Sequence, residues 1–143
     1  MQLNSKLGDL FSSTNEYAIA HCISSDFALG AGIALDFNRK FNSKMFLNNV
    51  NAQGKFPNCI RQRNSGKTIY HLVTKSKYWH KPTYGSLRES LTMMKENMLL
   101  NNETKLAIPK LGCGLDGLDW KLVRGIIEEI FKDTDIEILV YFI

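Results

Sequence analysis

The chain has 143 residues, of which 44% are hydrophobic and 22% charged, and its formal net charge is +4. This balance is typical of one folded domain over residues 1–143 and argues against a disordered chain. No hydrophobic run approaches the roughly 20 residues that cross a membrane, and the first residues lack the hydrophobic centre of a signal peptide. We therefore expect a monomer in the cytoplasm or the nucleus, without membrane contact.

The three cysteines, Cys22, Cys59 and Cys113, are odd in number and widely spaced. This pattern suits reduced thiols in a cytoplasmic or nuclear protein better than a set of disulfides. The spacing matches no zinc motif such as CxxC, and the chain contains no HExxH segment. We therefore predict no metal site and no other cofactor.

The first half of the chain alternates strand and helix patterns. Residues 17–23 are a short hydrophobic run that predicts a buried strand. Residues 33–41 carry hydrophobic side chains at helical spacing, and residues 44–52 allow a second helix. Two β-prone runs, 58–63 and 68–74, flank an Asn-Ser-Gly-Lys segment, which predicts a hairpin.

The second half continues the alternation. The clearest helix pattern covers residues 83–100, where Thr83 is a predicted cap and the hydrophobic stripe consists of Tyr84, Leu87, Leu91, Met94 and Met98. Residues 105–109 predict a strand that ends in a glycine loop, and residues 136–143 predict the last strand. Asp119 is placed to cap a helix between them, whose face consists of Trp120, Val123, Ile126, Ile127, Ile130 and Phe131.

Strands that alternate with helices predict an α/β fold, in which a mostly parallel sheet is covered on both faces and the hairpin makes it mixed. Ligands bind such sheets where strands end. Glycine loops at 30–32 and 112–114 follow two strands there, which predicts a phosphate-bearing ligand, with plain turns as the alternative. No GxxxxGK[ST] loop is present.

Five segments occur in an order that resembles one known family. They are 8–11 (GDLF), 20–24 (AHCIS), 30–34 (GAGIA), 80–84 (HKPTY) and 109–116 (PKLGCGLD). Together they resemble the macrodomain branch typified by the terminal ADP-ribose protein glycohydrolase, over residues 7–143. The resemblance implies a three-layer α/β/α sandwich around a mixed, mostly parallel sheet, with a first edge strand at about residues 2–7.

The resemblance also implies that ADP-ribose is the ligand. Asp9 matches the residue that accepts a hydrogen bond from the adenine amino group, and Leu10 offers its backbone amide. Tyr141 and Ile143 on the last strand are placed to flank the adenine. The alternatives are a turn role for Asp9, since aspartate is a common turn residue, and ordinary strand roles for Tyr141 and Ile143.

The resemblance assigns the ribose and the diphosphate to a second set of residues. Its two loops hold Gly30, Gly32, Ile33, Gly112, Cys113, Gly114 and Leu115. Backbone N–H groups in such loops recognise an anion with dipoles that are already oriented. His21 and Ser24 complete the set, with Ser24 shaping the ribose site and His21 in a structural rather than catalytic role. A Cys113 nucleophile with His21 or His80 as its base is a weaker alternative, because no nucleophile signature surrounds it.

Lys81 and Asp116 match the catalytic lysine and aspartate of the branch. A neutral lysine amine can attack the anomeric carbon of ADP-ribose and form a Schiff base. Lysine normally titrates near 10.4, so Lys81 must lose its proton, which burial beside the ligand or the charges of Lys75 and Lys77 would favour. Asp116 would act as general base and help release the adduct.

Two alternatives apply to this basic stretch. Residues 75–81 are equally typical of a solvated surface. Tyr78 and Trp79, with the neighbouring lysines, also suit a nucleic-acid surface, or the placement of a substrate whose ADP-ribose is attached to nucleic acid.

The predicted function is hydrolysis that removes mono-ADP-ribose or terminal ADP-ribose from Glu and Asp side chains of proteins. Members of this branch also deacylate O-acyl-ADP-ribose, and some act on ADP-ribosylated DNA. Two other functions remain open: a module that binds ADP-ribose without turnover, and a phosphatase acting on ADP-ribose 1''-phosphate.

Overall fold

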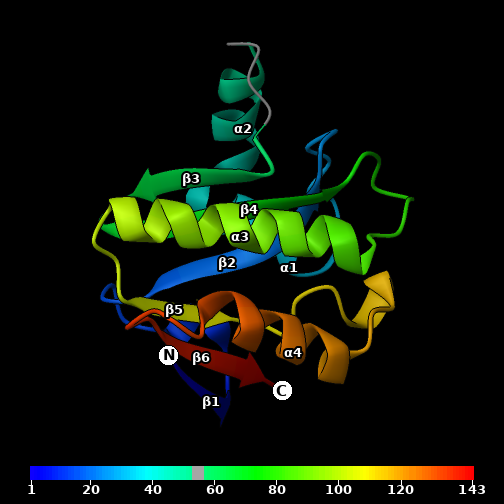
Figure 1. Cartoon of the computed structure of the whole chain (residues 1–143). Coiled ribbons are helices and arrows are strands. Elements are labelled where there is room, and N and C mark those ends of the chain that lie inside the picture. The colour runs from blue at the N-terminus through cyan, green and yellow to red at the C-terminus, as the bar shows by residue number, and fades with distance from the viewer. Residues whose placement is uncertain (53–56) are drawn as a thin grey trace.

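A computed structural model describes residues 1–52 and 57–143. Its sheet has six strands in the order β1-β6-β5-β2-β4-β3 (Figure 1). The strands are β1 (Gln2–Leu7), β2 (Ala18–Ser24), β3 (Cys59–Asn64), β4 (Lys67–Lys75), β5 (Lys105–Ile108) and β6 (Glu137–Phe142). The helices are α1 (Gly32–Phe41), α2 (Ser43–Ala52), α3 (Tyr84–Leu100) and α4 (Trp120–Phe131), with short 3-10 helices η1 (Leu10–Ser12) and η2 (Gly114–Asp116).

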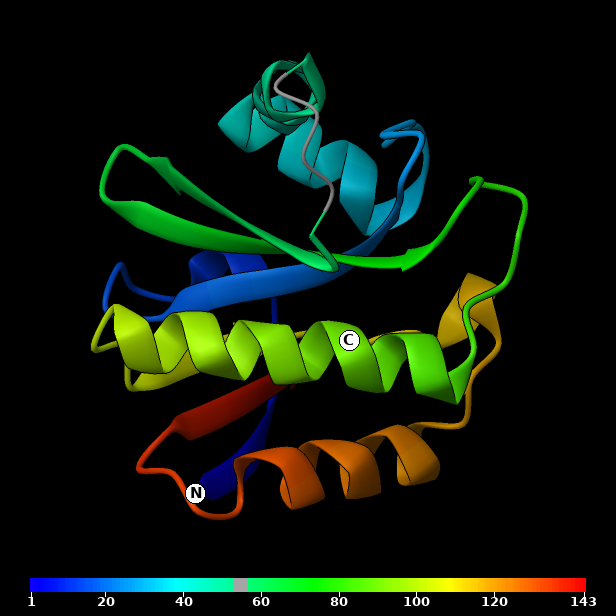
Figure 2. The same ribbon diagram turned by 45° about the horizontal axis from the view of Figure 1, so that its top comes forward.

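The sheet is mixed and mostly parallel, as predicted. Strands β1, β6, β5, β2 and β4 pair in parallel, and only β3 runs antiparallel, against β4 in the predicted hairpin. Helices α3 and α4 cover one face, and α1 lies behind the other (Figures 1 and 2). The chain therefore has the predicted α/β/α layers. Within the described ranges, no helix combines the length and hydrophobicity needed to span a membrane.

Helix α3 buries the stripe that the sequence predicts. Leu87, Leu91, Met94 and Met98 are fully buried against the sheet and α4. The Thr83 side chain accepts a hydrogen bond from the N–H of Ser86, and the N–H of Thr83 donates to Ser86 Oγ, a capping box that fixes the helix start. At α4, Asp119 accepts from the N–H of Lys121, which confirms its predicted cap.

Strands β2 and β5 separate soon after they begin. Their pairing covers only Ala18 with Leu106 and Ile19 with Ala107. The chain then leaves β2 for α1 on one face, and it leaves β5 for α4 on the other. Adjacent parallel strands whose connections run to opposite faces leave a crevice at their carboxyl ends, which is where α/β sheets bind ligands.

Candidate functional site

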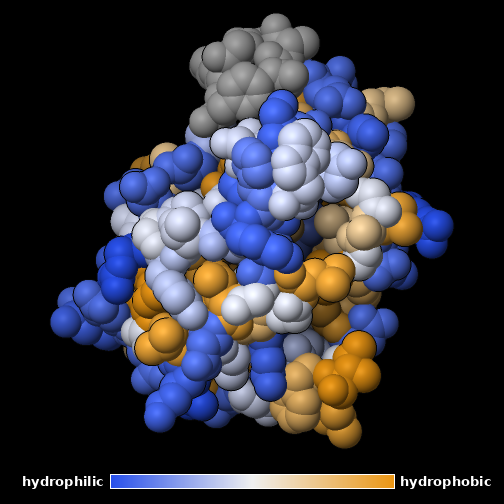
Figure 3. All heavy atoms as spheres, turned by 90° about the vertical axis from the view of Figure 1, so that its right-hand side faces the viewer, coloured by the Kyte–Doolittle hydropathy of each residue, from blue (hydrophilic) through white to orange (hydrophobic). Residues whose placement is uncertain are grey.

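A cavity of about 700 Å³ occupies this crevice. Figure 3 views the molecule from this side, where patches of hydrophobic atoms lie among hydrophilic ones. Three walls come from distant parts of the chain. They are the end of β2 with residues 28–34, the end of β4 with its following loop (Lys75, Tyr78, Lys81), and the η2 segment (Cys113, Leu115, Asp116).

The start of α1 forms one wall and carries free backbone donors. Ala31 is the N-cap residue and makes no side-chain hydrogen bond to the helix. The first N–H groups of such a helix have no partner within it and point toward the helix entrance, where they favour an anion. The predicted residues Gly30, Gly32 and Ile33 all line this wall, and Gly32 has a φ of +58° that favours glycine.

Asp26, which belongs to none of the sequence motifs, organises the loop between β2 and α1. Its carboxylate accepts hydrogen bonds from Ser24 Oγ (2.5 Å), the N–H of Ala28 (3.2 Å) and the N–H of Tyr78 (3.0 Å). Burial opposes ionisation, yet these three donors together hold the pKa of Asp26 below its usual value. Asp26 therefore ties two walls of the cavity together, and Ser24 lines the cavity as predicted.

The predicted catalytic residues meet at the opposite wall. Lys81 donates a hydrogen bond to the carbonyl oxygen of Leu115, the residue before Asp116. Asp116 pairs with Lys75 rather than with Lys81, at 2.8 Å between Nζ and Oδ1. The structure thus brings Lys81 and Asp116 to one cavity, although Lys81 is 34 residues away in the sequence from its hydrogen-bond partner Leu115. The Lys81 side chain is exposed, and its expected burial beside a bound ligand stays a prediction.

The second glycine loop differs in detail from the prediction. Cys113 and Leu115 line the cavity, whereas Gly112 and Gly114 shape the turn and do not form its wall. Gly112 is packed so tightly that a Cβ there would lie 2.7 Å from Leu118 Cδ1. The assignment of these two glycines to the diphosphate stays a prediction.

The cavity thiols are poor nucleophiles. Burial, reinforced by the charge of Asp116, raises the pKa of Cys22 to about 12. Burial also raises the pKa of Cys113, which counts against the cysteine-nucleophile alternative. His21, which was placed with the ligand-binding set, has no exposed surface. Its Nε2 lies 2.7 Å from His71 Nδ1, and its ring stacks on Phe37, so His21 belongs to the core and not to the cavity.

The four residues predicted to hold the adenine lie outside the cavity, around the end of β6. Asp9 caps η1 by accepting a hydrogen bond from the N–H of Phe11 (2.9 Å), which is the turn role given as its alternative. The N–H of Gly8 donates to the Phe142 carbonyl (2.8 Å), so Asp9 and Leu10 follow directly beside the end of β6. Leu10 and Tyr141 are buried and Ile143 is exposed, and the 700 Å³ cavity does not reach this group.

The rim of the cavity carries exposed aromatic side chains. Tyr78 and Trp79 are each 63% exposed, and their rings meet edge to face at 5.0 Å, which leaves ring faces open to solvent. Leu115 is exposed as well and lies on the opposite wall. The arrangement offers a hydrophobic contact surface to whatever group a bound ligand carries at the cavity mouth.

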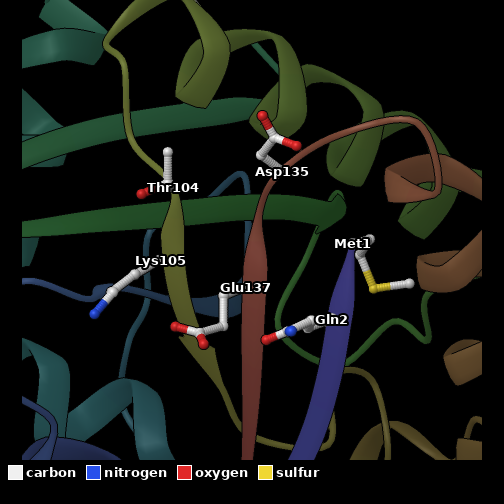
Figure 4. A pocket seen from close by; sticks show the side chains of 6 residues that line it. All are labelled: Met1, Gln2, Thr104, Lys105, Asp135 and Glu137. Carbon is white, nitrogen blue, oxygen red and sulfur yellow. The ribbon is translucent and has the colours of Figure 1, made fainter.

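A second, smaller cavity of about 380 Å³ lies at the other end of the sheet (Figure 4). It is lined by residues at the start of β1, β5 and β6, which include the charged side chains Lys105, Asp135 and Glu137. It contains none of the predicted site residues. Among residues 1–52 and 57–143, no group of three or more His, Cys, Asp or Glu side chains could hold a metal ion.

Comparison with known proteins gives a consistent family assignment. No protein-family model matches the chain. The ADP-ribose glycohydrolase OARD1 of Bos taurus is 46% identical over 134 residues, which cover 94% of this chain and 87% of the relative. The macrodomain of Thermus aquaticus DarG superimposes with a TM-score of 0.89 at 22% identity, covering 99% of both chains. Thermosipho africanus DarTG, solved in complex with ADP-ribose, gives a TM-score of 0.80 at 20% identity, covering 96% of this chain and 41% of that one.

Proposed function

Since the chain belongs to the ADP-ribose glycohydrolase branch of the macrodomain family, we propose that it is a hydrolase that removes ADP-ribose from Glu and Asp side chains. One observation carries the proposal: Lys81 and Asp116 line the same cavity as the uncapped start of α1. A module that only binds ADP-ribose needs the anion site but has no use for a lysine and an aspartate beside it.

The proposed binding mode follows the walls of the cavity. The diphosphate lies at the start of α1, where free N–H groups of Gly32 and Ile33 can donate to its oxygens. The terminal ribose then lies toward Lys81 and Asp116. The neighbour solved with ADP-ribose supports this choice of ligand, because it shares the fold at a TM-score of 0.80.

The proposed reaction uses one lysine and one water molecule. The neutral amine of Lys81 forms a bond to the anomeric carbon, and the bond from that carbon to the target's carboxylate breaks, so the target leaves as a carboxylate. Proton loss from the new C–N centre and ring opening give a Schiff base. Asp116 takes a proton from the water that adds to this carbon, and the amine of Lys81 then leaves. ADP-ribose is released, and the lysine returns to its starting state.

The test follows release of ADP-ribose from a glutamyl-ADP-ribosylated peptide. We expect steady release by the wild type and a loss of about a thousandfold or more in Lys81→Ala, because a covalent nucleophile is removed. Lys121→Ala is the matched control, since Lys121 is an exposed lysine on α4 outside the cavity. Equal rates in the wild type and Lys81→Ala would contradict the lysine mechanism.

The same assay separates the other functions. If the wild type binds ADP-ribose but releases none from the peptide, the chain is a binding module. If it releases phosphate from ADP-ribose 1''-phosphate, and Lys81→Ala does so equally well, it is a phosphatase. O-acyl-ADP-ribose tests the deacylase activity with the same pair of proteins.

A nucleic-acid acceptor is a second candidate, favoured by the exposed rings of Tyr78 and Trp79 at the cavity rim. Aromatic side chains stack on bases, and each stacked base contributes about 1–3 kcal/mol. The measurement compares release from an ADP-ribosylated single-stranded oligonucleotide and from a peptide. If Tyr78→Ala with Trp79→Ala slows only the oligonucleotide reaction, the rim serves nucleic acid. Equal slowing of both reactions would contradict that role.

A further inference from the structure

Lys75 joins the predicted catalytic aspartate to the sheet. It is the last residue of β4, and its Nζ lies 2.8 Å from Oδ1 of Asp116, which is 41 residues further along the chain. Both residues line the cavity. Lys75 lies outside the five motifs, so its position on the cavity wall needs an explanation beyond the effect of its charge on Lys81.

This ion pair is one of two in the described ranges that are shielded from water, the other being Arg61–Glu103, whose side chains are 27% and 16% exposed. The side chains of Lys75 and Asp116 are 14% and 19% exposed. By contrast, the pairs Arg88–Glu129, Lys105–Glu16 and Arg124–Glu128 are all at least 40% exposed on both sides. Water screens exposed pairs strongly, so they contribute little, whereas removing one partner of a shielded pair leaves an uncompensated charge. The Lys75–Asp116 pair is therefore able to control where the Asp116 carboxylate points.

The backbone of Lys75 is fixed independently of this pair. Its carbonyl oxygen accepts a hydrogen bond from the N–H of Ser25 (2.9 Å), and its Cα is in register with Ser24 just after a register shift between β2 and β4. The preceding carbonyl, of Thr74, accepts from Ser86 Oγ at the start of α3 (2.7 Å). Because two neighbouring elements hold the end of β4, the ammonium group of Lys75 is anchored on a rigid support.

Three side chains from three parts of the chain lie close to Asp116 or to the residue before it. Lys75 comes from β4, and Lys81 comes from the following loop, where it is bonded to the carbonyl of Leu115. Cys22 comes from β2, and burial, together with the charge of Asp116, raises its pKa to about 12, so its thiol is neutral. Of the two lysines, Lys75 is paired with Asp116, whereas Lys81 is bonded one residue away, at the carbonyl of Leu115.

We propose that Lys75 is a positioning residue that holds the Asp116 carboxylate toward the cavity and keeps it from pairing with Lys81. This proposal rests on the proposed function, since it assigns separate tasks to two lysines of the same site. A carboxylate paired with Lys81 would favour the protonated amine, which is no nucleophile. Lys75 neutralises the charge of Asp116 and leaves Lys81 available to the substrate.

The kinetic test compares Lys75→Met with Lys75→Arg. Methionine keeps the length and hydrophobic stem but removes the charge, whereas arginine restores a cation that can pair with Asp116. We expect Lys75→Met to lower kcat for release from a glutamyl-ADP-ribosylated peptide by about tenfold to a hundredfold, with the Kd for ADP-ribose changed less than about threefold. Lys75→Arg should recover most of this kcat.

The matched control is Lys105→Met, which removes a lysine from an exposed ion pair with Glu16, outside the 700 Å³ cavity. It should leave kcat unchanged. A merely structural role for Lys75 would lower kcat in proportion to the folded fraction, with no advantage of arginine over methionine. That result would overturn the proposal, as would an unchanged kcat in Lys75→Met.

A crystal structure of Lys75→Met tests the proposal without any turnover. We expect Asp116 to turn so that its carboxylate lies within ion-pair distance of Lys81 Nζ. An Asp116 side chain that keeps its present orientation would overturn the positioning role. If instead the variant shows the expected turn and the wild type releases no ADP-ribose, the proposed function fails and the structural effect of Lys75 stands.

Discussion

Strands β2 and β4 both contribute residues to two polar clusters, one buried in the core and one on the wall of the cavity. In the middle of the strands, His21 and His71 face each other in register and are fully buried. At the carboxyl ends, Ser24 and Lys75 lie on the wall of the cavity. The first cluster is composed of neutral groups, and the second contains two lysines and an aspartate.

The core cluster has one direction of hydrogen bonding. The amide nitrogen of Gln62 donates to the carbonyl of Phe41 (2.8 Å), so the amide oxygen faces His71 Nε2 (2.8 Å) and must accept from it. His71 Nδ1 then accepts from Nε2 of His21 (2.7 Å). His21 Nδ1 is left as a buried acceptor without a hydrogen-bond partner among the described residues. A proton added to Nδ1 of His71 would place two donors against each other and break this order.

Access to water therefore decides whether a polar residue on these two strands is charged or neutral. Burial lowers the pKa of His71 to about 3 and also lowers the pKa of His21, so both stay neutral and serve packing. At the cavity, the side chains of Lys75 and Asp116 keep partial contact with solvent and pair as ions. Only the second cluster offers charged and proton-accepting groups to a ligand.

The largest effect should come from removing the charge of the cavity cluster. Asp116→Asn keeps the shape of the side chain but removes the proposed general base and the partner of Lys75. We expect kcat for ADP-ribose release to fall by about a hundredfold to ten-thousandfold. Asp119→Asn is the matched control, because asparagine caps a helix as well as aspartate does. Full activity in Asp116→Asn would mean that the cavity cluster serves structure alone, like the core cluster.

The pH dependence of the free energy of unfolding tests whether the core histidines stay neutral in the folded protein. His71 has an ordinary pKa of 6.5 when unfolded and about 3 when folded. Between these values the unfolded chain binds the proton and the folded chain does not, so the free energy of unfolding falls as the pH falls. The histidine contributes its full stability above about pH 6.5, and the slope below it is about 1.4 kcal/mol per pH unit for each such histidine.

Urea unfolding at a series of pH values measures this slope. His21→Leu removes one of the two titrating rings and should make the curve shallower. An unchanged slope in that variant would show that His21 already carries a proton in the folded protein, against the burial argument.

Removing the His21–His71 hydrogen bond should lower the free energy of unfolding less than protonation of both histidines does. His71→Leu removes the partner of His21 Nε2 and leaves that buried donor unpaired, whereas the Gln62 amide oxygen still accepts from Ser43 Oγ (2.9 Å). We expect the free energy of unfolding to fall by about 1–3 kcal/mol, with kcat unchanged once substrate saturates the folded protein. A variant that folds normally but loses kcat would couple the two clusters and contradict their separation.

The smallest effect should come from the turn beside the cavity. Gly114 has a φ of +75°, and a Cβ there would meet no atom within 4 Å. Gly114→Ala should therefore lower the free energy of unfolding by only about 1 kcal/mol, through backbone strain. Gly112→Ala has a similar φ and in addition meets Leu118, so thermal unfolding should rank it as the less stable of the two. The reverse ranking would contradict the packing of this loop.

Most of the fold was predictable from local patterns. The hydrophobic stripe of α3, the caps at Thr83 and Asp119, and the hairpin of β3 and β4 all depend on residues a few positions apart. Cavity residues such as Lys81, Asp116 and Ser24 were predicted from the motifs of a family, and the structure brings them together.

The remainder depends on pairings that no local pattern contains. His21 meets His71 only because β2 and β4 pair in one particular register, which buried His21 in the core instead of at the ligand. The Lys75–Asp116 ion pair spans 41 residues, and Asp26 reaches Tyr78 across 52 residues. Such contacts follow from the packing of whole elements, so the sequence alone pointed to neither the role of Asp26 nor the partner of Asp116.

The most direct test of the central claim is to trap the bond between Lys81 and the ribose. The protein is incubated with a glutamyl-ADP-ribosylated peptide in the presence of borohydride, which reduces a Schiff base to a stable amine, and the modified lysine is located by mass spectrometry. We predict an ADP-ribose adduct on Lys81 of the wild type and no adduct in Lys81→Ala. Release of ADP-ribose without any trapped adduct, or an adduct confined to another lysine, would contradict the account.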